Sequence, residues 1–208
     1  MIFYSKSNQA FYDDTIHATL PNDALEISPE QHAALLAGQS AGQVIMPGKD
    51  GKPVLADPAP SHLHQWSGKE WTLDKAATSQ LLAESIDKGT KEINDLVDKA
   101  YRHVTRFQPE YEVREQQARD YKAGGCKGEA PLQVAAFAKP AGKTACEATD
   151  IIIAQADNLR MVMGKLGALR MRKFELKGLK TAAEVEKRTA EILAEIRPIA
   201  DKLGEVGK

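Results

Sequence analysis

Two long stretches of this 208-residue chain repeat apolar side chains at steps of three and four, and this repeat constrains the fold more than any other feature. The stretches run over residues 82–111 and 185–203. Such spacing places the apolar side chains on one stripe of an α-helix. A narrow stripe needs a helical partner to cover it. The sequence therefore predicts a helical hairpin or small bundle, and it leaves open whether the partner helix belongs to the same chain or to a second copy.

Helix start and stop signals divide this region. Thr144 and Thr181 each begin a capping box that ends in Glu, so each is expected to open a helix. A shorter helix is expected to open at Pro131. Pro109 should kink or restart the first long helix, and Gly178 should end the helix that begins at Thr144.

Three residues depart from the helical pattern. Gly89 weakens the first long stretch, and Pro198 is expected to bend the last one. Thr189 occupies the one polar position of the final stripe.

The first 60 residues have a different character. They hold six of the ten prolines and carry three basic against seven acidic side chains. Short strand signals at residues 2–4 and 10–12 predict one hairpin, and those at 43–46 and 53–55 predict another. Between them Ser28 should cap a short helix that ends at Gly38.

These signals together predict an α+β protein with a mainly helical C-terminal region. We expect a β-rich domain over residues 1–58, a linker over 59–72 and a helical domain over 73–208. Trp66 and Trp71 are expected to hold the linker down.

The overall composition points to a globular protein. Apolar residues make up 42% and charged residues 27% of the chain, and the net charge is −1. That charge predicts no bulk attraction to nucleic acid or to an anionic membrane. No apolar run approaches the roughly 20 residues that span a bilayer, and the N-terminus lacks the apolar core of a secretory signal. A cytoplasmic protein is the expectation.

The two cysteines, Cys126 and Cys146, lie 20 residues apart without a CxxC motif or a Cys–His cluster. Disulfides are rare in a reducing cytosol. Two free thiols are therefore expected, and a disulfide is the less favoured interpretation.

Motifs for catalysis are absent from the sequence. There is no GxGxxG, GxxxxGK[ST] or GxSxG, and the glycine-rich segment 124–128 lacks a strand–loop–helix setting. His62 and His64 have no third metal ligand nearby, and His17, His32 and His103 stand alone. The sequence predicts no enzyme, no metal and no cofactor.

Four of the twelve aromatic residues lie within the first twelve positions, as the pairs Phe3-Tyr4 and Phe11-Tyr12. Alternation along a strand sends the two rings of a pair to opposite faces. One ring of each pair should enter a small core, and the other should be left on the outer face. That face is a candidate for docking another protein. Cover by the linker or the helices is an equally open alternative.

A second functional hypothesis rests on residues 160–180, which carry seven basic side chains and one acidic one. A basic helix can grip phosphates, so this segment suggests a nucleic-acid-binding or regulatory protein. The simpler interpretation is a solvated face that complements acids on the next helix.

The N-terminal stretches "MIFYSKSNQAFYDDTIH", "LPNDALEISPEQHAALLAGQSAGQVI" and "DGKPVLADP" resemble the tail fibre assembly chaperones of tailed bacteriophages and phage-tail-like bacteriocins (tailocins). The likeness covers residues 1–58. The segments "YEVREQQARDYKAGG", "VAAFA", "ATDIIIAQAD" and "LGALRMRKFEL" look like the helical half of one branch of these proteins.

This resemblance implies a non-enzymatic assembly factor in the host cytoplasm. Its partner would be a trimeric tail fibre, especially the C-terminal receptor-binding tip, which it would help to fold and trimerise without ATP. Some members of the family stay attached to the finished fibre. The residues expected to contact the fibre are Phe3, Tyr4, Phe11, Tyr12 and His17.

Overall fold

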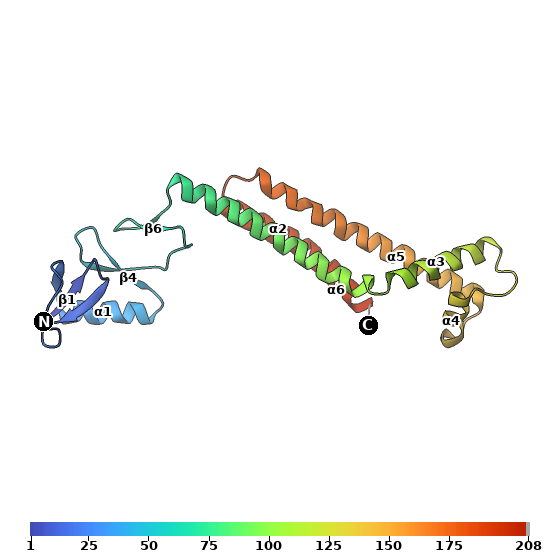
Figure 1. Cartoon of the computed structure of the whole chain (residues 1–208), viewed down its shortest axis with the longest axis horizontal. Helices are drawn as coiled ribbons and strands as arrows, with labels where there is room; N and C mark the ends of the chain where they lie inside the picture. Colours follow the sequence, from blue (N-terminus) through green and yellow to red (C-terminus); the bar gives the residue numbers. More distant parts are fainter. Residues whose placement is uncertain (207–208) are drawn as a thin grey trace. The chain divides into compact units, whose positions relative to one another are not determined.

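The computed structural model describes residues 1–206, apart from the side chains of His103 and of residues 204–206. Short strands lie at the N-terminal end and long helices follow, which confirms the expected α+β class (Figure 1). The chain divides into two compact units, residues 1–81 and residues 82 onward, and each is described by itself.

The first unit contains a three-stranded antiparallel sheet with strand order β2-β1-β3. Its strands are β1 (Ile2–Ser5), β2 (Ala10–Asp13) and β3 (Ala24–Ile27). The β1–β2 hairpin was expected from the sequence. The third strand was not, because it is four residues long and its alternation is too short to stand out from the turn before it.

Helix α1 (Pro29–Ser40) follows the sheet and begins with the predicted capping box, in which Ser28 and Gln31 bond reciprocally. The prediction that Gly38 ends this helix was wrong. A Cβ atom at Gly38 would lie 2.3 Å from Cδ1 of Leu55, so this glycine lets a neighbouring strand pack closely. The helix stops at residue 40, just before Gly42, whose φ of +97° favours glycine.

The predicted second hairpin is present as β4 (Val44–Pro47) and β5 (Pro53–Ala56). Within the segment expected to be a linker, β6 (Gln65–Trp66) and β7 (Trp71–Thr72) form a short third hairpin. Its two indole rings pack with centroids 5.2 Å apart. Trp66 Nε1 donates to the carbonyl of Pro47, and Trp71 Nε1 donates to that of Asp57, each at 2.7 Å. The tryptophans therefore hold this segment down, as predicted.

The helices that follow β7 begin and end largely where the sequence indicated. They are α2 (Lys75–Thr105), α3 (Gln108–Ala123), α4 (Leu132–Ala141), α5 (Ala145–Met171), the 3-10 helix η1 (Arg172–Gly178) and α6 (Ala182–Val206). Pro109 lies in the first turn of α3, and Thr144 caps α5 with the expected box. The helix expected to continue from Thr144 to Gly178 changes to 3-10 geometry after Met171.

The main core of the second unit is formed by α2, α5, η1 and α6, which pack against one another within one chain. The partner helices that the apolar stripes require are therefore intramolecular. The fully buried members include Ile93, Leu166, Leu176, Ile192 and Ile196. A smaller cluster joins α3, α4 and the first turns of α5, with Val134 and Ile152 among its buried residues. Helix α5 contributes residues to both clusters.

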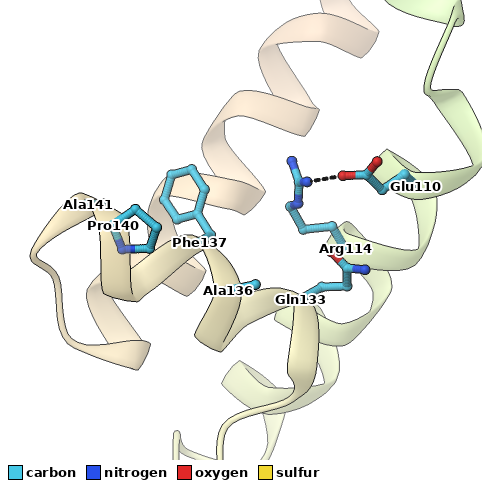
Figure 2. Close-up of a pocket in the computed structure, with 7 residues that line it drawn as sticks. All are labelled: Glu110, Arg114, Gln133, Ala136, Phe137, Pro140 and Ala141. Atoms are coloured by element: carbon cyan, nitrogen blue, oxygen red, sulfur yellow. Dashed lines mark hydrogen bonds and ion pairs between the residues drawn. The ribbon is translucent and has the colours of Figure 1, made fainter.

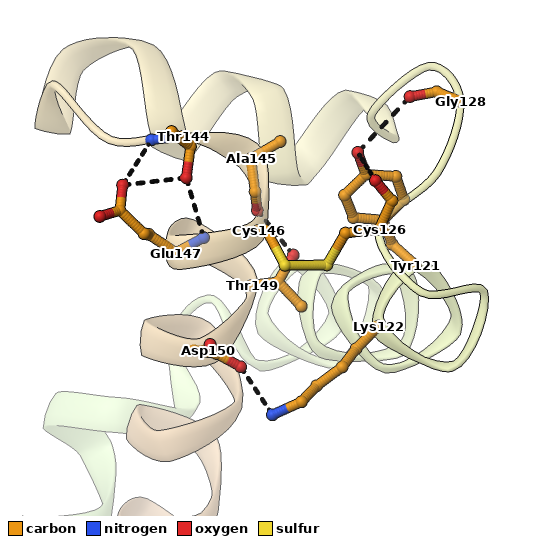
Figure 3. Close-up of a disulfide and its surroundings, with 10 residues drawn as sticks. All are labelled: Tyr121, Lys122, Cys126, Gly128, Thr144, Ala145, Cys146, Glu147, Thr149 and Asp150. Atoms are coloured by element: carbon orange, nitrogen blue, oxygen red, sulfur yellow. Dashed lines mark hydrogen bonds and ion pairs between the residues drawn. A yellow bond between two sulfur atoms is a disulfide. The ribbon is translucent and has the colours of Figure 1, made fainter.

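The expectation of free thiols is contradicted by a disulfide between Cys126 and Cys146, whose Cα atoms lie 5.6 Å apart (Figure 3). The loop after α3 turns back toward the first turn of α5. The hydroxyl of Tyr121, near the end of α3, donates to the carbonyl of Cys126 in this loop at 3.1 Å. Residue spacing alone could not reveal this return of the chain. The bridge fastens the end of α3 to the start of α5 around the smaller cluster.

Candidate protein-docking surface

The register of the three-stranded sheet sorts the N-terminal aromatics onto two faces. Tyr4 lies directly opposite Phe11 on β2, whereas Phe3 lies opposite Tyr12. On the other side Phe3 faces Glu26 of β3. Residues paired across antiparallel strands share a face. The two sequence pairs are thereby separated into an inner and an outer aromatic pair.

The inner pair belongs to the core of the first unit. Tyr4 is fully buried, and its ring centroid lies 5.4 Å from that of Phe11, which also packs edge-on against His32 at 4.6 Å. Burial raises the pKa of the Tyr4 phenol. Ile27 and Leu35 complete the core. Tyr4 was expected to contact a partner, but its buried ring has no surface to offer one, and Phe11 is largely occupied by packing.

The outer pair remains accessible. Phe3 and Tyr12 are half-buried and lie outside the core cluster. The exposed His17 ring packs against Tyr12 in a T-shaped arrangement with centroids 5.1 Å apart. Asn8 Nδ2 donates to the Tyr12 hydroxyl at 2.8 Å, which holds that ring in place. Three of the five residues expected from the sequence, Phe3, Tyr12 and His17, thus share this region.

Two further residues join this surface, and sequence reasoning missed both. Ile16 is 78% exposed, although it lies in an ordered turn next to His17. Glu26 enters the outer face only because β3 pairs with β1, a strand that the sequence did not reveal. We refer to Phe3, Tyr12, Ile16, His17 and Glu26 as the outer face.

The turn that presents Ile16 and His17 is fixed by Asp13. Its carboxylate accepts hydrogen bonds from the Thr15 hydroxyl at 2.6 Å and the Thr15 amide at 2.8 Å, and these bonds lower the pKa of the Asp13 carboxyl. The Asp13 carbonyl accepts from the amides of Ile16 and His17. The Asp13 amide donates to His17 Nδ1 at 3.1 Å. An exposed apolar side chain on a turn held this firmly loses little entropy on binding.

Two cavities lie in the helical unit. One of about 430 Å³ is lined by residues of α3 and α4, and its charged groups, Glu110 and Arg114, form an ion pair with each other (Figure 2). None of its seven lining residues is Ser, Cys, His or Lys. The second, of about 540 Å³, is lined mainly by apolar side chains of α2, α3, α5 and α6. Neither lining brings a nucleophile next to a base.

Residues 1–206 contain neither a metal-binding cluster nor a helix able to span a membrane. No group of three or more His, Cys, Asp or Glu side chains is placed there to hold a metal ion. His64 Nδ1 instead lies 2.8 Å from the Ser61 hydroxyl. No helix in this part of the chain is both long and apolar enough to cross a bilayer.

Several basic side chains of segment 160–180 form ion pairs within the protein. Arg160 contacts Glu115 at 2.5 Å and Asp157 at 3.0 Å. Arg172 contacts Glu175 at 2.9 Å and Glu195 of α6 at 2.6 Å. These bonds raise the pKa of both guanidinium groups and hold helices together. The segment therefore has less charge available for phosphates than its composition suggests.

Part of this sequence is similar to proteins of two phages. No protein-family model and no solved structure matches the chain. Over 124 residues, covering 60% of this chain and 62% of the relative, it is 35% identical to an uncharacterized 23.3 kDa protein of Haemophilus phage HP1. Over 61 residues, covering 28% of this chain and 36% of the relative, it is 39% identical to a probable tail fibre assembly protein of Shigella phage SfV.

The chain thus spans less than two thirds of the length of either relative. Both relatives are phage proteins, and one carries a name for a tail fibre assembly role. These partial similarities agree with the resemblance to phage tail fibre assembly proteins that the sequence indicates.

Proposed function

We propose that this protein is a non-enzymatic assembly factor that binds a phage tail fibre protein and promotes its folding and trimerisation without ATP. The observation that carries the proposal is the 39% identity to a probable tail fibre assembly protein. The contact with the fibre is made by the outer face, which combines accessible aromatic rings, an exposed isoleucine and a carboxylate. Aromatic and aliphatic anchors of this kind dominate protein–protein binding energy.

The physical task of such a factor follows from how β-rich trimers fold. Their strand pairs are non-local, so they form slowly and leave apolar faces and unpaired edges exposed in the meantime. A protein that covers one such surface lowers the rate of aggregation and raises the fraction of chains that pair correctly. Binding energy alone suffices for this, so no hydrolytic site is required.

Co-production tests the proposal. A tail fibre protein encoded by the same phage genome is expressed in bacteria alone, with the wild-type protein, and with the double variant Phe3→Ala/Tyr12→Ala. We expect soluble fibre trimers only with the wild type, measured by sedimentation and native mass. Phe174→Ala is the matched control, because Phe174 is 55% exposed but lies in η1, an element of the other unit. Soluble, trimeric fibre produced alone would contradict the proposal.

A further inference from the structure

The hydrogen-bonding pattern of the sheet determines which backbone groups are open to a partner. The amide of Asp14 donates to the carbonyl of Met1, so Met1 and Asp14 form a hydrogen-bonded pair. Such pairs alternate along antiparallel strands, so Phe3 bonds to Tyr12 and the residues of β1 on either side of Phe3 bond to β3. The outward-pointing backbone groups are therefore those of Phe11 and Asp13 on β2, and of Ala24 and Glu26 on β3.

Two of these four edge residues already form hydrogen bonds. The amide of Asp13 donates to His17 Nδ1, and its carbonyl accepts from the turn that follows. The amide of Ala24 donates to the carbonyl of Pro21. Within residues 1–206, one residue on each edge has no recorded backbone partner, Phe11 on β2 and Glu26 on β3. A partner strand added to either edge could form backbone hydrogen bonds with a single residue there. Extended strand addition is therefore a poor docking mode here.

The side chains of the outer face are a better candidate for partner binding than the backbone of the sheet edges. Tyr12, Phe3 and Glu26 form one row across the three strands, and side chains paired in this way have Cβ atoms about 5 Å apart. Glu26 is exposed and forms no hydrogen bond or ion pair with the described residues. It exerts only a longer-range attraction on the N-terminal ammonium, which is bonded to Asp14. A carboxylate without a partner thus lies beside two accessible rings.

The surrounding charge favours a cationic ligand. Residues 1–30 contain five acidic side chains and one basic one, Lys6. The aliphatic stem of Lys6 lies near Gly51 of the β4–β5 turn, and Gly51 is also approached by Leu25, a residue of the inner face. The sequence contains no arginine before Arg102. Among the described residues, no lysine or arginine side chain forms an ion pair with Glu26.

We infer that the outer face binds an arginine side chain of its protein partner, with the guanidinium packed on the rings of Phe3 and Tyr12 and hydrogen-bonded to Glu26. A planar guanidinium both stacks on aromatic rings and bonds a carboxylate in bidentate fashion, which the ammonium of lysine does not do. Ile16 and His17 flank this site and contact the apolar surface beside the arginine. The inference rests on the proposed function, in which that partner is the tail fibre.

The site can be probed without the fibre. The ¹⁵N-labelled full-length protein is titrated with the capped tripeptides acetyl-Gly-Arg-Gly-amide and acetyl-Gly-Lys-Gly-amide, and amide chemical shifts are followed. We expect the arginine peptide to shift the amides of Phe3, Tyr12 and Glu26 and the lysine peptide to bind several-fold more weakly. Glu26→Gln should weaken binding of the arginine peptide about tenfold. Glu70→Gln, in the β6–β7 turn, serves as the matched charge control and should bind as wild type.

Equal shifts with the two peptides, shifts located away from the outer face, or undiminished binding by Glu26→Gln would overturn the inference. Glu26 is exposed, so its variant should melt like the wild type, and a melting curve verifies that it folds. The two proposals also fail separately. Loss of the arginine preference with intact fibre trimerisation would leave the assembly function standing. A confirmed arginine site in a protein that never affects the fibre would reject the assembly function alone.

Discussion

A Cβ atom added to Gly89 of α2 would lie 2.3 Å from the hydroxyl oxygen of Thr189 on α6. The two helices therefore approach each other closely at this point, and the contact tolerates no side chain on α2. The sequence presents Gly89 as a weak point in a helix and Thr189 as a polar gap in an apolar stripe. The structure shows that these two irregularities meet.

Gly89→Ala should lower the stability of the helical unit even though alanine is the better helix former. Overpacking costs about 1–3 kcal/mol, against about 1 kcal/mol gained in helix propensity. Thermal unfolding should show a lower melting temperature. In a Thr189→Ala background the same change should cost less, so a double-mutant cycle should give a favourable coupling between the two alanines.

Gly164→Ala is the matched control for this experiment. Gly164 lies inside α5, and a Cβ there would meet no atom within 4 Å. That variant should gain up to about 1 kcal/mol from helix propensity alone. A stabilising Gly89→Ala, similar to the control, would show that α2 and α6 do not approach as described.

Removal of the disulfide should loosen one end of the helical unit selectively. A bridge that closes a loop of this size contributes about 3 kcal/mol in the chain-entropy account. In the double variant Cys126→Ala/Cys146→Ala, hydrogen exchange should accelerate in α4 and the adjoining end of α3. Amides around Ile93 and Ile192 in the main core should keep their protection. Unchanged exchange in α4 would mean that the small apolar cluster holds this region without the bridge.

Acid should weaken the contact between α3 and α5. Hydrogen bonds from Arg160 and Arg119 lower the pKa of the Glu115 carboxyl, and Arg160 does the same for Asp157. A carboxyl with a depressed pKa in the folded protein stabilises the fold above its ordinary pKa and loses this contribution as acid protonates it. For Glu115 the loss should begin as the pH falls below its ordinary value of 4.5.

Chemical denaturation at several pH values measures this effect. In Glu115→Gln the unfolding free energy should fall less steeply with decreasing pH below 4.5 than in the wild type, because the titrating group is absent. Glu191→Gln is a useful comparison, since Glu191 pairs with Arg188 outside this network and no large change in the α3–α5 contact should follow. An identical pH dependence for wild type and Glu115→Gln would exclude the network as its source.

Tyr4 and Phe3 should differ strongly in how much their replacement by alanine destabilises the first unit, although they are neighbours in sequence. Tyr4→Ala empties the centre of the β core and should cost about 3–5 kcal/mol. Tyr4→Phe should be neutral or stabilising, because the Tyr4 hydroxyl is buried and has no hydrogen-bond partner among the described residues. Phe3→Ala should lower the melting temperature of the first unit far less than Tyr4→Ala. A larger loss at Phe3 would mean that the outer ring also belongs to the core.

The features that local sequence determines were predicted well. The capping boxes at Ser28 and Thr144, the restart at Pro109 and the paired hairpins all depend on residues within a few positions of one another. These features are determined by interactions between residues close in sequence, so they can be predicted without knowledge of the tertiary fold.

The features that depend on distant contacts were not predictable in the same way. β3 is defined by its pairing with β1, and the role of Gly38 by Leu55 from another strand. The disulfide depends on a return of the loop after α3. The candidate site was affected by the same limit, because alternation alone could not decide which ring of each aromatic pair faces the core. The register of the sheet decides which ring faces the core. It places Tyr4 in the core and Glu26 opposite Phe3.

The most direct test of the central claim is retention of the tail fibre protein by wild-type protein and by Phe3→Ala/Tyr12→Ala at matched concentration, with melting temperatures measured in parallel. We predict that the double variant keeps nearly the wild-type melting temperature and loses most of its fibre binding, while Phe174→Ala retains both. Fibre retention by the double variant equal to that of the wild type would contradict the account, and so would a wild-type protein that never retains the fibre.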